Sequence, residues 1–315
     1  MPDWIIRPFN IEDLGAIVKV QNVCAPVHKV GLGEMQRDME TLAPELQRII
    51  FVAASGQEII GFCSAQRQAG TYHPRKFMLE LGVSLDFRRK GIGSALYDAM
   101  TSHLQPFSVI SLSVQVAESD VGSVKFATDR GFAEQKRDFV SELSVPSFDM
   151  SLFVESKAKM AEQGVEIRCF DELDSPDFRR TWYDLFCEVR QDVPRSEPPT
   201  PITFEFFDEQ VINEPDLART ATLFAFKDGQ CIGFTGGFHD KDNSLLDQWL
   251  TAVKREYRGL GVAFALKTFQ IAATKELGIA TIKTDNDARN APMLAINGRL
   301  GFIRQPAVLS MRKDY

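Results

Sequence analysis

The clearest pattern along the chain is a segment in which every second residue is hydrophobic, followed by one in which hydrophobic residues recur every three or four positions. The alternating segment covers residues 77–83 and predicts a β-strand. The second segment covers residues 92–100 and predicts an amphipathic helix. Residues 86–93, which join them, are rich in glycine and basic residues. The pattern therefore predicts a strand, a glycine turn and a helix in direct succession.

The same succession occurs a second time, later in the chain. A strand is predicted through Trp249, Thr251 and Val253, and a glycine-containing segment follows at residues 256–263. After it, hydrophobic residues spaced for one helix face are Val262, Leu266, Phe269 and Ala273. The unit of strand, turn and helix is therefore predicted twice.

Other landmarks repeat in the same order. Residues 51–62 are echoed by residues 223–234, and Gly131-Phe132 returns as Gly301-Phe302. The spacing is about 170 residues, which is the length of a whole domain and far longer than the repeats of a solenoid. The chain is therefore interpreted as one domain that occurs twice.

The junction between the two copies is predicted near residues 144–164. A helical pattern there ends at Gly164, and glycine is typical just after a helix. We predict an N-terminal domain over residues 1–147, a linker helix over 148–164 and a C-terminal domain over 165–315. The second copy contains a proline-rich stretch at residues 192–201, which is predicted to be a stiff connection or a loop over a substrate mouth.

Composition and charge narrow the classes of function. Of the 315 residues, 44% are hydrophobic and 25% are charged, and the net charge is -7. Because nucleic-acid binders usually carry a basic surface that neutralises phosphates, no nucleic-acid partner is expected. The start of the chain lacks the pattern of a secretory signal, and no apolar run approaches the roughly 20 residues of a membrane helix. We therefore expect a cytoplasmic protein that does not interact with a membrane.

Cysteine and histidine usage argues against a metal site. The five cysteines are scattered and never spaced as CxxC, which indicates reduced thiols. The four histidines show no metal-ligand spacing. No metal cofactor is expected.

A strand that leads through glycines into a helix forms a site for anions. Glycine lets the backbone approach a ligand, the first helical N–H groups lack partners within the helix, and the helix dipole adds positive potential. Arg88, Arg89 and Lys90 bring cations to the first turn, and Arg258 brings one to the second. Neither turn has the GK[ST] of a P-loop or the third glycine of a dinucleotide-binding fingerprint.

Both turns resemble the signature of the GNAT superfamily of acyl-CoA-dependent N-acetyltransferases, [Gln/Arg]-x-x-Gly-x-[Gly/Ala]. Residues 88–93 and 258–263 both fit it, and Glu80-Leu-Gly-Val83 is similar to the Glu-Leu-x-Val strand of the family. Residues 290–302 resemble its second signature, and residues 120–132 resemble it more loosely. The resemblance covers nearly the whole chain as two tandem domains, a layout similar to that of mycothiol synthases.

The resemblance implies an α/β (α+β) fold of two tandem GNAT (acyl-CoA N-acyltransferase) domains, each a mixed, mostly antiparallel sheet flanked by helices. It also implies acetyl-CoA as co-substrate, with its pyrophosphate bound by backbone amides of the turns. The residues expected to bind it are Leu81, Val83, Arg88, Arg89, Lys90, Gly91, Ile92, Gly93, Ser94, Val253, Arg258, Gly259, Leu260, Gly261, Val262, Ala263 and Asn290.

The resemblance implies catalytic roles for a few side chains. Glu80 matches the strand position of a general base, although a solvent-facing strand glutamate is an equal alternative, and the aligned residue of the second copy is Leu250. Where many family members carry a tyrosine acid, this chain has Ala127 and Asn297. Asn297 is a candidate to hydrogen-bond the pantetheine or thiol, or else a helix-packing residue, and Asn290 is also a candidate helix cap.

Two interpretations of the duplication are open: both copies bind acetyl-CoA and at least one catalyses, or one copy is structural. We favour the first, because the glycine turns are intact in both copies. The predicted function is N-acetylation of the amine of a small, cationic molecule by a monomer or homodimer. The alternatives are a non-catalytic acyl-CoA-binding sensor or scaffold and a peptide or protein N-acetyltransferase.

Overall fold

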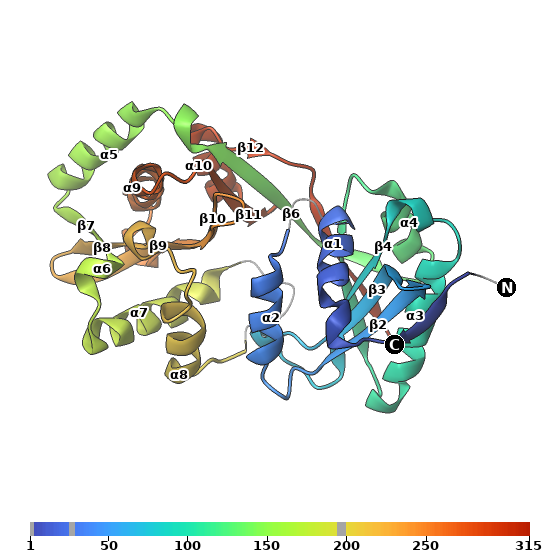
Figure 1. Cartoon of the computed structure of the whole chain (residues 1–315). Helices are drawn as coiled ribbons and strands as arrows, with labels where there is room; N and C mark the ends of the chain where they lie inside the picture. The colour runs from blue at the N-terminus through green and yellow to red at the C-terminus, as the bar shows by residue number, and fades with distance from the viewer. Residues whose placement is uncertain (1–2, 25–28, 194–199) are drawn as a thin grey trace. The chain divides into compact units, whose positions relative to one another are not determined.

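The structure is a computed structural model that describes residues 3–24, 29–193 and 200–315. The described chain divides into two compact units (Figure 1). One comprises residues 3–24, 29–137, 200 and 307–315, and the other comprises residues 138–193 and 201–306. Most of the proline-rich stretch, residues 194–199, lies outside the described residues.

The first unit is built on a mixed sheet in which, among the strand pairings of the described residues, one pair of neighbouring strands is parallel. That pair is β4 and β5, and the other neighbours run antiparallel. The strands in spatial order are β1 (Ile5–Pro8), β2 (Arg48–Ser55), β3 (Glu58–Gln66), β4 (Lys76–Val83), β5 (Ser111–Ala117) and β13 (Val308–Asp314).

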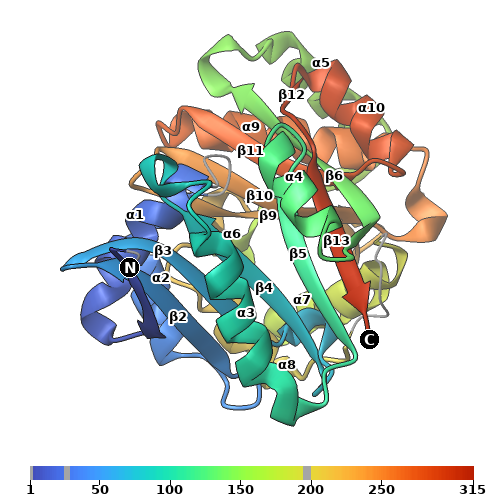
Figure 2. The same cartoon turned by 90° about the vertical axis from the view of Figure 1, so that its right-hand side faces the viewer.

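Helices cover both faces of this sheet. On one face α1 (Leu14–Cys24) packs its Ile17 and Val20 against Val52 and Phe62. The other face is covered by α3 (Ile92–Leu104), which Figure 2 shows lying across the sheet, and by α4 (Val121–Thr128). A further helix, α2 (Leu32–Glu40), follows α1. Each strand therefore alternates between two hydrophobic layers, as the period of two predicts.

The second unit repeats this plan. Its only parallel pair is β10 with β11 among the pairings of the described residues. The strands in spatial order are β6 (Ala133–Ser144, of which residues 138–144 lie in this unit), β11 (Thr281–Asp287), β10 (Leu245–Val253), β9 (Gln230–Asp240), β8 (Leu223–Lys227) and β7 (Val165–Cys169), with β12 (Ile303–Arg304) beside β6.

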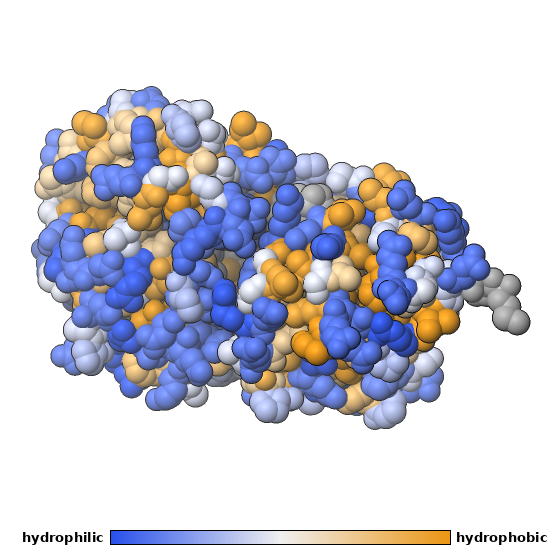
Figure 3. Space-filling view, in the orientation of Figure 1, coloured by the Kyte–Doolittle hydropathy of each residue, from blue (hydrophilic) through white to orange (hydrophobic). Residues whose placement is uncertain are grey.

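The two faces of the second sheet differ in their packing. On one face α9 (Val262–Glu276) lies under α5 (Met150–Glu162), and the ring of Phe153 is 4.8 Å from that of Phe269. The other face carries α7 (Pro176–Val189) and α8 (Phe204–Phe207) over a cluster of aromatic rings. The outer surface of α7 and α8 is largely hydrophilic (Figure 3). The short α6 (Phe170–Leu173) follows β7, and α10 (Ala291–Leu300) follows β11.

The predicted domain boundaries need correction at two places. Residues 138–147 and the predicted linker helix 148–164 belong to the second unit, where Met160 of α5 is buried with Val165 and Val262. Residues 307–315 belong to the first unit, where β13 pairs along its length with β5. The last strand of each copy, β6 or β13, thus pairs in the sheet of the other copy, because hydrogen-bonded strand partners are chosen by geometry and not by nearness in sequence. No helix among the described residues is long and apolar enough to cross a membrane.

Candidate active sites at the two glycine turns

The first glycine turn presents backbone N–H groups at the start of α3. Gly91 has a φ of 85°, which a residue with a side chain adopts only with strain. The first hydrogen bond of the helix runs from Ala95 N to Gly91 O at 3.0 Å. The N–H groups of Ile92, Gly93 and Ser94 precede it and therefore have no helical acceptor. The backbone geometry of the turn is therefore that of the strand, turn and helix expected from the sequence, and anion binding by these N–H groups stays a prediction.

The signature arginine of this turn holds the end of the strand. Arg88 Nε donates to Val83 O at 3.2 Å, and its Nη1 donates to Asp120 Oδ2 at 3.2 Å. The side chain is therefore engaged in shaping the turn, whereas the neighbouring Arg89 and Lys90 are exposed at its rim. Those two are better placed than Arg88 to meet a phosphate.

The second turn has the same internal construction. Gly261 has a φ of 88°, and Ala265 N donates to Gly261 O at 3.0 Å. Arg258 Nε donates to Val253 O at 3.0 Å, and its Nη2 donates to Asp192 Oδ2 at 2.5 Å. Arg255 also donates to the Asp192 carboxylate, and the hydrogen bonds from Arg255 and Arg258 lower the pKa of Asp192 well below its usual range. Both copies thus use an arginine to hold the preceding strand end.

A lysine that the motif search did not single out lies beside the second turn. Lys159 Nζ, from α5, is 3.2 Å from the place that a Cβ at Gly261 would occupy. It adds a cation near the helix N-terminus, where an anion is also favoured by the helix dipole. The sequence offers no signal for this placement, because Lys159 lies about 100 residues earlier in the chain.

In both units the parallel strands separate next to the turn. β4 pairs with β5 from Lys76 to Leu79, and beyond that point Glu80 and Val83 pair only with β3. β10 pairs with β11 from Leu245 to Gln248 and then separates in the same way. The second unit has a bulge here, so that Trp249 is an extra residue. Each unit therefore has a wedge between two strands that leads to its glycine turn.

Glu80 lies at the wedge of the first unit, on the face that α1 covers. Burial raises the pKa of its carboxyl to about 7, and the charge of Arg48 and a hydrogen bond from the Gln21 side chain oppose that rise. Gln21 is only 8% exposed, and its Oε1 is buried without a hydrogen-bond partner among the described residues. Sequence reasoning predicted Glu80 but missed Gln21, which is a polar residue on the buried face of α1.

The equivalent face of the second unit is filled with hydrophobic side chains. Leu250 pairs with Gly236 as Glu80 pairs with Ser64, and it packs into the aromatic cluster. The ring of Trp249 lies 5.1 Å from that of Phe186. Asp247, an acidic residue of β10 three positions before Leu250, is ion-paired with Lys283 at 3.0 Å. The cluster comprises Phe170, Trp182, Leu185, Phe186, Val189, Phe207, Ile212, Leu217, Phe224, Cys231 and Phe234 with their neighbours.

On its opposite face the second unit buries a chain of polar side chains. Lys267 of α9, 1% exposed, donates to Gln248 Oε1, and Gln248 Nε2 donates to Gln270 Oε1. Thr235 Oγ1 donates to Gln270 Oε1 at 3.1 Å and lies 2.7 Å from Thr251 Oγ1. Burial lowers the pKa of Lys267 to about 7. Sequence reasoning missed this chain, because a lysine within a helix is usually exposed.

The two asparagines of the second signature lie on α10. Asn290 Oδ1 accepts from Met293 N at 3.4 Å, which is the capping contact considered as its alternative role. Asn297 is 2% exposed and its Nδ2 donates to Asn286 Oδ1 at 2.5 Å. Its Oδ1 is buried with no hydrogen-bond partner among the described residues. Because such a group is costly to leave unpaired, it is suited to accept a hydrogen bond from a ligand.

The other predicted residues lie around the two turns and wedges. Those of β4 and β10 are at the strand ends beyond the point of separation, and those of α3 and α9 are in the first helical turn. They are Leu81, Val83, Ile92, Gly93 and Ser94 in the first unit and Val253, Val262 and Ala263 in the second, where Gly259 and Leu260 lie in the turn between β10 and α9. Within the described parts of the chain no group of three metal-ligating side chains comes together.

Comparison with known proteins identifies the family. The Acetyltransferase (GNAT) family matches twice, at residues 20–132 and 178–302. A curated relative, "N-alpha-acetyltransferase MAK3" of Arabidopsis thaliana, is 34% identical over 112 residues, which are 35% of this chain. The match spans only about half of that relative, 55% of its length.

Solved structures share the two-unit fold. A GCN5-related N-acetyltransferase from Sphaerobacter thermophilus superposes with a TM-score of 0.75 at 17% identity, covering 100% of this chain and 96% of that one. A tandem GNAT protein from the clavulanic acid biosynthesis pathway gives a TM-score of 0.77 at 18% identity, covering 99% and 98%. The tandem arrangement of two such domains is therefore shared along the whole chain.

Proposed function

The chain belongs to the acetyltransferase (GNAT) family and is an acyltransferase with two such domains, and from this premise we propose that it transfers the acetyl group of acetyl-CoA to the amine of a small, cationic molecule. The first unit carries the reaction, with Glu80 as general base. The observation that carries this proposal is the half-buried carboxyl at the wedge, with a pKa raised to about 7.

A base of this kind suits the chemistry. An ammonium of pKa near 10 must lose a proton before its nitrogen attacks a thioester, and general bases work best with a pKa near the working pH. With a pKa of about 7, Glu80 is substantially ionised at neutral pH yet still basic enough to take that proton. The proton moves to the carboxylate directly or through one water.

The neighbourhood of Glu80 supports an amine as the acceptor. Gln21 Oε1 and the Glu80 carboxylate are both hydrogen-bond acceptors, and the first is buried without a partner among the described residues. An amine brings N–H donors to both, and its positive charge compensates the carboxylate. Gln21 acts here as a positioning residue and Glu80 as the base.

The residues around each turn fit acetyl-CoA. The co-substrate supplies a thioester as acyl donor. In the first unit, the N–H groups of Ile92, Gly93 and Ser94 bind pyrophosphate, with Arg89 and Lys90 at the rim. In the reaction an N–C bond forms, the C–S bond breaks, the amine proton goes to Glu80, and the thiolate is protonated from solvent or a bound water.

The second unit binds acyl-CoA without this acceptor site. Its turn has the same geometry, and in this proposal Asn297 Oδ1, which is buried without a hydrogen-bond partner among the described residues, accepts from an amide N–H of the pantetheine. Leu250 and the aromatic cluster occupy the face where a base and an amine would have to lie. Its role is that of a binding or regulatory domain.

A second candidate function is N-acetylation of a peptide or protein. The match to N-alpha-acetyltransferase MAK3 favours it, although that match spans only part of both proteins. The two functions share Glu80 and differ in the acceptor that reaches it.

Substitution of Glu80 tests the proposal. Glu80→Gln should lower kcat/KM for amines by about 10² to 10⁴ near neutral pH, the usual contribution of a general base. The loss should shrink as pH rises toward 10, because the free amine then no longer needs a base. The measurement is CoA release from acetyl-CoA over a panel of small amines and peptides from pH 6 to 10.

The matched control is Glu58→Gln, an exposed glutamate on β3, which should leave the profile unchanged. Saturable acetyl-CoA binding without CoA release from any acceptor would support a sensor instead. Turnover of peptides but not of free amines would favour the second candidate.

A further inference from the structure

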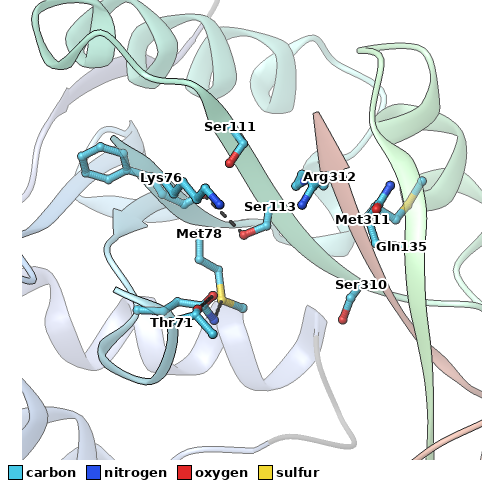
Figure 4. Close-up of a pocket in the computed structure, with 11 residues that line it drawn as sticks. Thr71, Lys76, Met78, Ser111, Ser113, Gln135, Ser310, Met311 and Arg312 are labelled. Atoms are coloured by element: carbon cyan, nitrogen blue, oxygen red, sulfur yellow. Dashed lines mark hydrogen bonds between the residues drawn. The ribbon is translucent and has the colours of Figure 1, made fainter. Parts of the chain in front are cut away.

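The first unit has a small polar hollow among residues of β4, β5 and β13 (Figure 4). It has a volume of about 70 Å³, which holds a few water molecules and not a whole ligand. Lys76 and Arg312, the two cations of its lining, both interact with further groups. A cation whose hydrogen-bond partners are all neutral lies instead beside the glycine turn of this unit.

That cation is Arg130, which follows α4 and reaches the first helical turn of α3. Its Nη2 donates to Ser94 Oγ at 2.8 Å, and its Nη1 donates to Phe126 O at 3.2 Å. The guanidinium lies 3.5 Å from the centre of the Phe126 ring, a stacking that attracts a cation. The same ring packs over Gly93, 3.5 Å from the place that a Cβ would occupy. The guanidinium is therefore held next to the glycine turn.

Among the described residues, no carboxylate forms an ion pair with Arg130. Its two hydrogen-bond acceptors are a hydroxyl and a backbone carbonyl. The nearby acidic residues have other partners, because Asp129 pairs with Lys125 at 2.9 Å and Asp120 pairs with Arg88 at 3.2 Å. A half-buried guanidinium without an acid beside it is suited to an anionic ligand, since burial reduces screening of its charge by water.

Ser94 connects this cation to the N–H groups of the turn. The Ser94 N–H is one of those that have no acceptor within the helix. By covalent geometry the nitrogen is about 3 Å from its own Oγ, so the guanidinium is on the order of 6 Å or less from that N–H. The oxygens of a pyrophosphate span a similar length, so one pyrophosphate can accept hydrogen bonds from both Ser94 and Arg130.

We propose that the guanidinium of Arg130 binds the pyrophosphate of acetyl-CoA together with the N–H groups at the start of α3. The inference rests on the proposed function, in which acetyl-CoA lies at this turn, and adds a binding residue from outside the turn. The second unit has no equivalent, because the matching position is Leu300, which is 2% exposed in a hydrophobic cluster. Arg130 therefore acts on one of the two proposed sites.

Calorimetric titration of the full chain with CoA tests the proposal. Arg130→Gln should raise Kd at one site by about tenfold to a hundredfold, the effect of losing a charged hydrogen bond, and should leave the other site unchanged. Dephospho-CoA keeps the pyrophosphate but lacks the 3′-phosphate, so its Kd should rise by the same factor. In steady-state kinetics the KM for acetyl-CoA should rise with little change in kcat. A loss of affinity for CoA alone overturns the assignment to the pyrophosphate.

Two further variants separate this effect from damage to the fold. Lys125→Met removes a cation from the same helix that is already paired with Asp129, and it should leave both Kd values unchanged. Arg130→Lys keeps the charge and should retain more affinity than Arg130→Gln. Raising the ionic strength should weaken the first site of wild type more than that of Arg130→Gln, because less charge is left to screen. Equal Kd values or equal salt dependence in wild type and Arg130→Gln overturn the proposal.

The same titration distinguishes failure of this inference from failure of the proposed function. It measures binding of CoA and involves neither Glu80 nor an acceptor. If no amine is acetylated but Arg130→Gln weakens CoA binding at one site, only the proposed function fails. If amines are acetylated and Arg130→Gln binds CoA as wild type does, only the role of Arg130 fails.

Discussion

The two units share their backbone and differ in the side chains on one face of the sheet. In both units an arginine donates to the backbone at the end of the strand, and a glycine with positive φ precedes the helix. In both, the two parallel strands stop pairing before the strand reaches this turn. On the acceptor face the first unit has Glu80 and Gln21, whereas the second has Leu250 packed among aromatic rings. The shared turn is thus a property of the backbone, and the proposed acceptor site of the first unit is a property of a few side chains.

Each unit also buries a titratable group beside its wedge, but on opposite faces and with opposite charge. Burial raises the pKa of Glu80 and lowers that of Lys267, both to about 7. Removing a charged group from water favours its neutral form, which explains both directions. The carboxyl faces α1 and the proposed amine, whereas the ammonium extends from α9 toward Gln248 of β10, in a chain of buried amides and hydroxyls.

The largest expected difference between the units is in turnover. Lys267→Met should leave kcat within about twofold, whereas Glu80→Gln should lower kcat/KM by about 10² to 10⁴. The physical reason is that Lys267 lies on the face away from any acceptor. The measurement is steady-state CoA release, with Lys275→Met on the exposed side of α9 as the matched control. A large loss of turnover in Lys267→Met but not in Glu80→Gln would indicate that the second unit carries the reaction.

Next in size is an opposite dependence of stability on pH. Between the ordinary value of 4.5 and about 7, folded Glu80 holds a proton that the unfolded chain has lost, so the free energy of unfolding falls as pH rises. Between about 7 and 10.5 the unfolded chain holds the extra proton at Lys267, so the free energy of unfolding rises with pH.

Each contribution is on the order of 3 kcal/mol or more, from about 1.4 kcal/mol per pKa unit. Glu80→Gln should flatten the fall and Lys267→Met should flatten the rise, as measured by urea unfolding from pH 4.5 to 10. If the two variants keep the wild-type slopes, the buried groups do not titrate as described.

The smallest expected effect is on acetyl-CoA affinity, when the glycine of one turn or the other is replaced. Gly91→Ala and Gly261→Ala each force a side chain into a positive φ, at a cost of roughly 1–2 kcal/mol. Acetyl-CoA affinity at the altered turn should fall about tenfold, one site at a time, in a calorimetric titration. Turnover should fall only with Gly91→Ala. A wild-type titration with a single site would mean that one turn does not bind the co-substrate.

Local features were predictable because their causes are local. The strand, turn and helix at Arg88 and at Arg258 follow from alternating hydrophobic residues, positive-φ glycines and the apolar face of the next helix. The placement of Glu80 next to the turn follows from strand periodicity. Its raised pKa does not, because burial depends on α1, which lies about 60 residues earlier in sequence.

Features that depend on distant segments were not predictable in the same way. The repeat predicted two domains with a boundary near residue 147. In the structure β6, the last strand of the first copy, pairs with β11 of the second unit, and β13, the last strand of the second copy, pairs with β5 of the first unit. The same exchange brings Arg312 beside Ser113, about 200 residues apart in sequence. A row across three strands is set by hydrogen-bond register, and no single segment carries that information.

The sequence by itself determined the duplicated family fold, the two glycine turns and the candidate base, because each depends on residues close together in the chain. The tertiary structure decided which side chains line the equivalent faces of the two sheets. Gln21 and Arg312 come to the first sheet from α1 and from the last strand, and the aromatic residues of α7 and α8 close the second. Packing between distant segments sets burial, and burial sets both the pKa of Glu80 and the space for an acceptor.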